Sequence, residues 1–166
     1  MISPAPASRE AEFDARAFAL RKRAEKKVAA EDIGVDADFI DQMVESFYTA
    51  IQGDDLLAPI FAERVHDWPV HLARMKGFWR SVLHNSGEFS GNPMLKHLAI
   101  PGLELAHFVR WLDLFYATLR RLESHPQAIG LVAGRARMIA DSLLTAIEMR
   151  RSGLAGGRAG KDLPHV

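Results

Sequence analysis

Residues 67–85 read DWPVHLARMKGFWRSVLHN, and this stretch predicts a long amphipathic helix. Asp67 is suited to cap its N-terminus, and Pro69 falls in the first turn, where a missing backbone N–H does no harm. Large apolar residues recur at steps of three, four, seven and eight, which keeps them on one side of a helix. That side carries a histidine in the middle of a heavy aromatic face, which comprises Trp68, His71, Met75, Phe78, Trp79 and Val82.

Three further segments, 36–53, 104–123 and 126–151, repeat the helical period. The first begins at a plausible N-cap, Asp36, and stops at Gly53. Segment 104–123 is almost continuously apolar, so it is expected to run through the middle of the fold. Nothing reads as a strand pair, and 166 residues suit one domain. The sequence therefore predicts an all-α fold with four main helices.

The two ends of the chain differ in composition from this helical part. Residues 11–30 are rich in helix formers but carry only a thin apolar stripe with many basic residues. We therefore predict an N-terminal extension over 1–35 that is partly helical or disordered. Residues 152–166 contain several glycines without an apolar period, which predicts a flexible tail behind a domain at 36–151.

The composition excludes several classes of function. Lysine plus arginine equal aspartate plus glutamate at 21 each, so no charge excess favours nucleic acid as a partner. No apolar run approaches the roughly 20 residues of a transmembrane segment, and no secretory signal is visible, which predicts a cytoplasmic protein. The chain has no cysteine, so a transition metal would have to be held by histidine or carboxylate.

The short stretch NPMLKHL at 92–98 raises a question of stability. A helix confined between Pro93 and Pro101 is too short to be stable by propensity, so tertiary contacts must hold it. A bond from His97 to a metal in a buried cofactor would do so, and the glycine-containing loop before it would let the element adjust.

Three more side chains on apolar helix faces carry a polar group, namely the hydroxyl of Tyr48, the imidazole of His71 and the indole N–H of Trp111. Each has an ordinary explanation, because a buried histidine, phenol or indole is often satisfied by nearby backbone. Together with His97, however, they suggest one shared ligand within an apolar helical core. A flat, mostly apolar cofactor that carries iron fits this set.

Three stretches in this order carry a resemblance to a known family: FYTAIQGDDLLAPIF at 47–61, the segment 67–98, and FVRWLDLF at 108–115. They resemble the truncated haemoglobins of group III, which are small bacterial globins with a two-over-two helical fold. The resemblance covers roughly residues 38–151 and leaves the extension and the tail unexplained. It implies haem b as cofactor and the two-over-two globin fold.

The resemblance also implies roles for individual residues. His97 would be the proximal iron ligand, and Tyr48, His71 and Trp111 would lie on the distal side, with His71 as a candidate sixth ligand. Phe61 would lie against the porphyrin and Met75 would line the distal cavity. For the remaining candidates a plain structural role is an open alternative: core packing for Phe78, Trp79, Leu98 and Ile100, and solvation instead of a propionate contact for Arg74 and Lys96.

The function that the resemblance implies is the binding of dioxygen and other small diatomic ligands. Hydrogen bonds from distal donors to a polarised ligand are worth on the order of 1.5 to 3 kcal/mol each, so ligand release would be slow. Slow release favours redox, nitric oxide or peroxide chemistry over oxygen transport, with a reductase as a candidate partner. Oxygenase or peroxidase-like enzyme activity is left open.

A different class of function also has some support in the sequence. HLARMKG at 71–77 has a faint look of a histidine phosphotransfer site. In that class the lysine and glycine follow the histidine by three and four positions, whereas Lys76 and Gly77 follow His71 by five and six. A cofactor-free helical module for interaction or signalling is therefore kept as the alternative to a haem protein.

Overall fold

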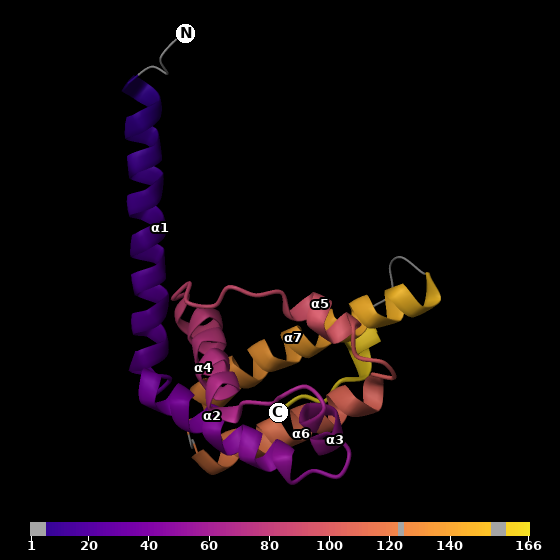
Figure 1. Cartoon of the computed structure of the whole chain (residues 1–166). Helices are drawn as coiled ribbons and strands as arrows, with labels where there is room; N and C mark the ends of the chain where they lie inside the picture. The colour runs from indigo at the N-terminus through magenta and orange to yellow at the C-terminus, as the bar shows by residue number, and fades with distance from the viewer. Residues whose placement is uncertain (1–5, 123–124, 154–158) are drawn as a thin grey trace.

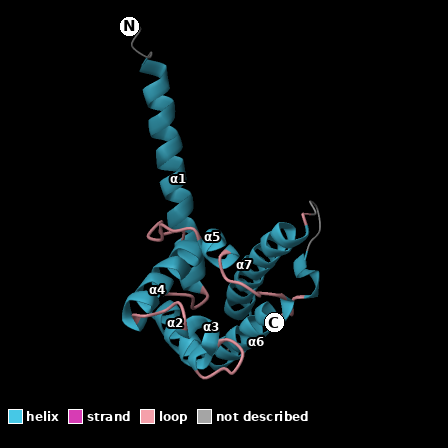
Figure 2. Cartoon of the chain, turned by 45° about the vertical axis from the view of Figure 1, so that its right-hand side comes forward, coloured by secondary structure: helices cyan, strands magenta, loops and turns pink. Residues whose placement is uncertain are grey.

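The computed structural model describes residues 6–122, 125–153 and 159–166 of the chain, and this part is helical without any strand (Figure 2). The prediction of an all-α fold is confirmed. The elements are α1 Pro6–Asp32, α2 Ala37–Gln52, α3 Ala58–Ala62, α4 Trp68–His84, α5 Pro93–Leu98, α6 Leu105–Leu122, α7 Pro126–Ser152 and a 3-10 turn, η1, at Ala159–Asp162.

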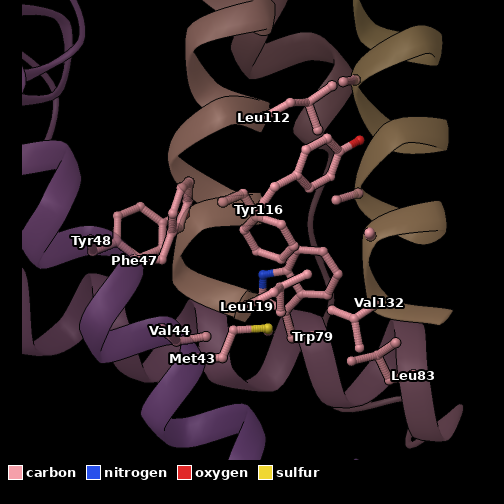
Figure 3. Close-up of a cluster of buried hydrophobic side chains, with 14 of the residues drawn as sticks. Met43, Val44, Phe47, Tyr48, Trp79, Leu83, Leu112, Tyr116, Leu119 and Val132 are labelled. Atoms are coloured by element: carbon pink, nitrogen blue, oxygen red, sulfur yellow. The ribbon is translucent and has the colours of Figure 1, made fainter. Parts of the chain in front are cut away.

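The body of the molecule is built from two pairs of long helices (Figure 1). Helix α2 packs on α4, α6 packs on α7, and α2 also packs on α6, so that the pairs enclose one core. The core side chains come from all four helices, as Met43, Leu83, Leu112 and Val132 illustrate (Figure 3). The short helix α5 lies on α7 and α3 lies beside α2, so both short helices border the same body.

Side-chain caps set where the helices begin. The Asp36 carboxylate accepts a hydrogen bond from the Phe39 N–H at 2.8 Å, and the Asp67 carboxylate accepts one from the Val70 N–H at 3.1 Å. Both expected caps are therefore present. Asn92 caps α5 in the same way, with its side-chain oxygen 3.0 Å from the Leu95 N–H. Each such cap satisfies a backbone donor that the first turn leaves unpaired.

Helix α6 differs from its expected central position. It buries one face, including Phe108, Leu112 and Phe115, while Arg110 and Asp113 on the other side are exposed. Arg110 and Asp113 stand three residues apart, so the helical period of the sequence already marked this exposed side. The helix borders the core instead of running through it.

The C-terminal residues 159–166 also differ from the predicted flexible tail. Leu163 is buried, the Tyr116 hydroxyl donates to the Pro164 carbonyl at 2.9 Å, and Arg137 Nη2 donates to the Leu163 carbonyl at 3.2 Å. These contacts fix the end of the chain on α6 and α7. No local pattern predicts them, because the partners lie far away in the sequence. Residues 154–158 of the predicted tail and 1–5 of the predicted extension lie outside the described residues.

Helix α1 extends away from the body, as Figure 1 shows. Only its C-terminal end is attached: Ala30 is buried, and the Lys26 ammonium donates to the Val82 carbonyl of α4 at 3.0 Å. The turn after α1 is tied to the end of α4, because His84 Nε2 lies 2.6 Å from the Val35 carbonyl oxygen. The extension thus contains a long helix with little support along most of its length.

Asp54, at the corner after α2, is a buried carboxylate that joins three elements. One of its oxygens accepts from the Leu57 N–H at 3.0 Å and the Leu56 N–H at 3.1 Å, and the other accepts from Arg110 Nε at 2.6 Å. Burial by itself would raise the pKa of Asp54, but the hydrogen bonds from Arg110 and from the Leu57 and Leu56 amides outweigh it and lower the pKa. The corner that leads into α3 is thereby fixed to α6.

Replacing Asp54 by alanine is expected to lower the free energy of unfolding by about 2 kcal/mol, since it leaves the buried Leu57 N–H unpaired and removes the charged partner of Arg110. The lowered pKa means that the carboxylate stabilises the fold above its unfolded-state pKa, and that this contribution is lost as the pH falls through the folded-state pKa. Urea unfolding at neutral and acidic pH measures both effects. Asp55→Ala, at the exposed neighbouring carboxylate, is the control and should change stability by less than about 0.5 kcal/mol. Equal effects of the two substitutions would contradict the assignment.

Candidate functional site

Four aromatic rings meet between α2, α3 and α4. The ring centroid of His71 lies 5.1 Å from that of Tyr48, 5.6 Å from that of Trp68 and 6.4 Å from that of Phe61. Tyr48 comes from the buried face of α2, Phe61 from α3 behind the Asp54 corner, and Trp68 from the first turn of α4. The sequence-predicted residues Tyr48, Phe61 and His71 are therefore brought together by the fold.

The imidazole of His71 has an unsatisfied nitrogen. Its Nε2 atom is buried and has no hydrogen-bond partner within the described part of the chain. Burial, followed by the positive charges of Arg74 and Lys96, lowers the pKa of His71, so the ring is neutral at pH 7. A buried polar atom without a partner requires an explanation, and a ligand in this space would supply the partner.

Tyr48 is a buried phenol whose ring contacts Phe61, Trp68 and His71. Its exposed fraction is 5%, and burial raises the pKa of its hydroxyl far above the ordinary value. The group therefore stays protonated throughout the neutral range, and it can donate a hydrogen bond but does not carry charge.

Trp111 reaches this region through a second set of rings. It stacks on Phe115 with centroids 5.4 Å apart and meets Phe47 edge to face at 5.3 Å. Phe47 in turn lies 5.1 Å from Tyr48. The rings of α2 and α6 thus form a continuous aromatic packing between Trp111 and the cluster around His71.

His97 lies on α5, and one of its ring nitrogens forms a hydrogen bond within the same helix. Its Nδ1 atom is 2.7 Å from the Pro93 carbonyl oxygen, and a carbonyl only accepts, so Nδ1 carries the proton. Burial lowers the pKa of His97, against the opposing effect of this hydrogen bond. The result is a neutral ring whose Nε2 lone pair is left for another partner, which is the state that a metal-ligating histidine requires.

Lys96 connects the two histidine regions. Lys96 precedes His97 on α5, and its positive charge lowers the pKa of His71 on α4, so the two side chains lie within electrostatic range of one another. Arg74 also acts on His71, and its guanidinium lies over the Phe89 ring at 5.6 Å from the centroid. Both cations are exposed.

The remaining predicted residues lie in or against the core. Trp79 is buried and stacks on Phe115 at 5.1 Å, and its ring packs in the middle of the core in Figure 3. The other predicted pocket residues are partly buried and pack against the core: Met75, Phe78, Leu98 and Ile100.

Trp68 belongs to the ring cluster but is not among the predicted site residues. Its indole meets His71 edge to face and stacks on Phe61 at 6.5 Å. The sequence did contain a signal for Trp68. It lies three residues before His71 on the predicted aromatic face, so the two side chains share one side of the helix.

The protein side chains alone do not form a metal site. Across residues 6–122, 125–153 and 159–166, no group of three or more histidine, aspartate or glutamate side chains is placed to hold a metal ion. A metal bound at His97 would therefore take most of its ligands from a non-protein group. In the same described ranges, no helix has the length and apolar character needed to cross a membrane.

Comparison with known proteins gives two informative matches. No protein-family model matches the chain. The group 3 truncated hemoglobin ctb of Campylobacter jejuni is 30% identical over 110 residues, which cover 64% of this chain and 86% of that protein. The crystal structure of the group III truncated hemoglobin from Campylobacter jejuni superposes with a TM-score of 0.64 at 28% identity, covering 68% of this chain and 91% of the other. The predicted two-over-two globin fold is confirmed, and the chain belongs to the group III truncated haemoglobins.

Proposed function

We propose that this globin binds haem b with His97 as the proximal iron ligand. The observation that carries the proposal is the hydrogen bond from His97 Nδ1 to the Pro93 carbonyl, which leaves Nε2 unprotonated. The chain has no cysteine for covalent attachment through thioether bonds, so we propose a haem held without covalent links, of the b type. The ring cluster on the α4 side offers a flat apolar group aromatic contacts, and it contains the one unsatisfied nitrogen of His71.

The haem would supply an iron atom able to bind dioxygen and other diatomic molecules. The chain's own residues would decide how long such a molecule stays. The Tyr48 hydroxyl and the indole N–H of Trp111, whose rings both pack on Phe47, would donate hydrogen bonds to a polarised ligand. Neutral His71 would either join them as a donor or bind the iron as a sixth ligand. Phe61 would exclude water, and Arg74 and Lys96 would pair with the propionates.

This set of neutral donors, of which Tyr48 is buried, supports slow ligand release. We therefore propose redox chemistry of dioxygen, peroxide or nitric oxide in preference to oxygen transport, with electrons delivered by a reductase in the cytoplasm. Whether turnover is oxygenase-like or peroxidase-like depends on the substrate admitted to the site.

The first test is a titration of the apo-protein with haem. One equivalent should bind, and the visible spectrum should shift on reduction and again on addition of carbon monoxide. A protein that takes up no stoichiometric haem would instead be a cofactor-free helical module, and the proposal would be wrong.

The role of His71 is decided by His71→Leu. Loss of a low-spin signal from the resting ferric spectrum would assign His71 as the sixth ligand. An unchanged spectrum would exclude this ligation and leave His71 as a hydrogen-bond donor. Trp68→Leu is the matched control, because it changes the same ring cluster without removing a nitrogen that can bind iron.

A further inference from the structure

Helix α1 presents large apolar side chains to solvent on a part that stands clear of the body (Figure 1). Phe13 and Leu20 are 73% and 56% exposed. Together with Ala17 and Ala24 they form a stripe at alternating steps of four and three residues, which is the spacing of a two-helix coiled coil. We call these four residues the α1 seam.

The α1 seam faces away from the helix's own attachment to the body. At about 100° per residue, the attached residues Lys26 and Ala30 lie roughly 110° to 150° around the helix from the centre of the seam. A helix of this length normally owes its stability to packing of its apolar face. Since the body packs against another side of α1, the seam is available to a second helix.

We propose that the α1 seam pairs with the same seam of a second copy of this chain, with the two helices antiparallel. Large and small residues alternate along the seam. In an antiparallel pair, Phe13 packs against Ala24 of the partner subunit and Leu20 packs against Ala17 of the partner subunit. A parallel pair would place alanine against alanine and leave voids, which cost packing energy.

Charges beside the seam favour the same orientation. Asp14 and Arg21 follow Phe13 and Leu20, so both lie along one edge of the seam. Neither forms an ion pair within the described chain. Antiparallel pairing brings Asp14 of each copy to Arg21 of the other, which gives two symmetric ion pairs. The opposite edge carries Arg16 and Arg23, which face one another across the pair and weaken it, so the association is moderate.

Sedimentation of the full-length protein over a micromolar concentration series tests the pairing. The wild-type chain should dimerise reversibly, and Leu20→Glu should be monomeric. Phe18→Glu is the matched control, because Phe18 is 54% exposed on the same helix but lies roughly 140° from Phe13. It should leave the dimer intact. A wild-type chain that stays monomeric, or equal disruption by both variants, would overturn the proposal.

Charge exchange tests the orientation. Asp14→Arg should weaken dimerisation about tenfold or more, and the double variant Asp14→Arg with Arg21→Asp should restore it. Arg16→Glu should tighten the dimer, since it replaces two repulsions by two attractions. A double variant that dimerises no better than Asp14→Arg alone would rule out the antiparallel pairing.

Two further measurements accompany these variants. Circular dichroism on each variant checks that α1 stays helical. If the wild-type chain is monomeric and instead cosediments with anionic vesicles, a membrane is the partner of the seam and the dimer is refuted.

Discussion

His97→Ala is expected to weaken haem binding on the order of 100-fold or more, and to abolish the coordination spectrum of the wild-type protein. The reason is that the substitution removes a neutral imidazole whose hydrogen bond to the Pro93 carbonyl leaves Nε2 unprotonated and able to bind iron. Transfer of haem to an excess of apomyoglobin measures the loss, and ferrous spectra report the coordination. Free imidazole added to the variant should restore part of the spectrum by occupying the vacated position.

His66→Ala is the control for this experiment. His66 is exposed in the loop before α4 and lies in none of the ring contacts of the site, so its removal should leave haem affinity and spectra unchanged. If His97→Ala retained haem with the wild-type spectrum, the proximal assignment would fail even though the family assignment would stand.

Tyr48→Phe should accelerate dioxygen dissociation by roughly 10- to 150-fold, because one hydrogen bond to a polarised ligand is worth about 1.5 to 3 kcal/mol. Carbon monoxide, which accumulates less negative charge, should be affected less. Since burial raises the pKa of Tyr48 and keeps its hydroxyl protonated, the effect should not depend on pH in the neutral range. Stopped-flow displacement of dioxygen by carbon monoxide measures the rate.

The other tyrosine of the chain provides a matched control. Tyr116 is also buried, but its hydroxyl donates to the Pro164 carbonyl and not to the ring cluster. Tyr116→Phe should therefore lower the free energy of unfolding by about 1 kcal/mol and leave ligand release unchanged. Equal dissociation rates for Tyr48→Phe and the wild type would show that Tyr48 does not contact the ligand, and would remove the main support for redox chemistry over transport.

The helices of the body were predictable because their signals are local. Asp36, Asp67 and Gly53 mark helix ends through contacts within a turn, and the apolar period between them is a property of one segment. The contacts among Tyr48, Phe61 and His71 join three different helices, so no local pattern predicts them. Only the resemblance to the globin family implied that they share a site. The structure adds the Asp54 corner, which positions Phe61.

The two features that the sequence prediction missed have different causes. The packed C-terminal segment depends on Tyr116 and Arg137, which are remote in sequence from the carbonyls that they bind, so no reading of single segments could predict it. The exposed side of α6 carries Arg110 and Asp113, whose helical spacing was present in the sequence, but the prediction gave more weight to the number of apolar residues.

The hydrogen bond between His97 and Pro93 has one more consequence. Donor and acceptor belong to the same six-residue helix, so the direction of the imidazole is set inside α5 and not by the surrounding body. Packing on α7 sets the position of α5, whereas the hydrogen bond within α5 sets the direction of the imidazole relative to the helix. A shift of α5 along α7 would therefore move the ring without rotating it against its own helix.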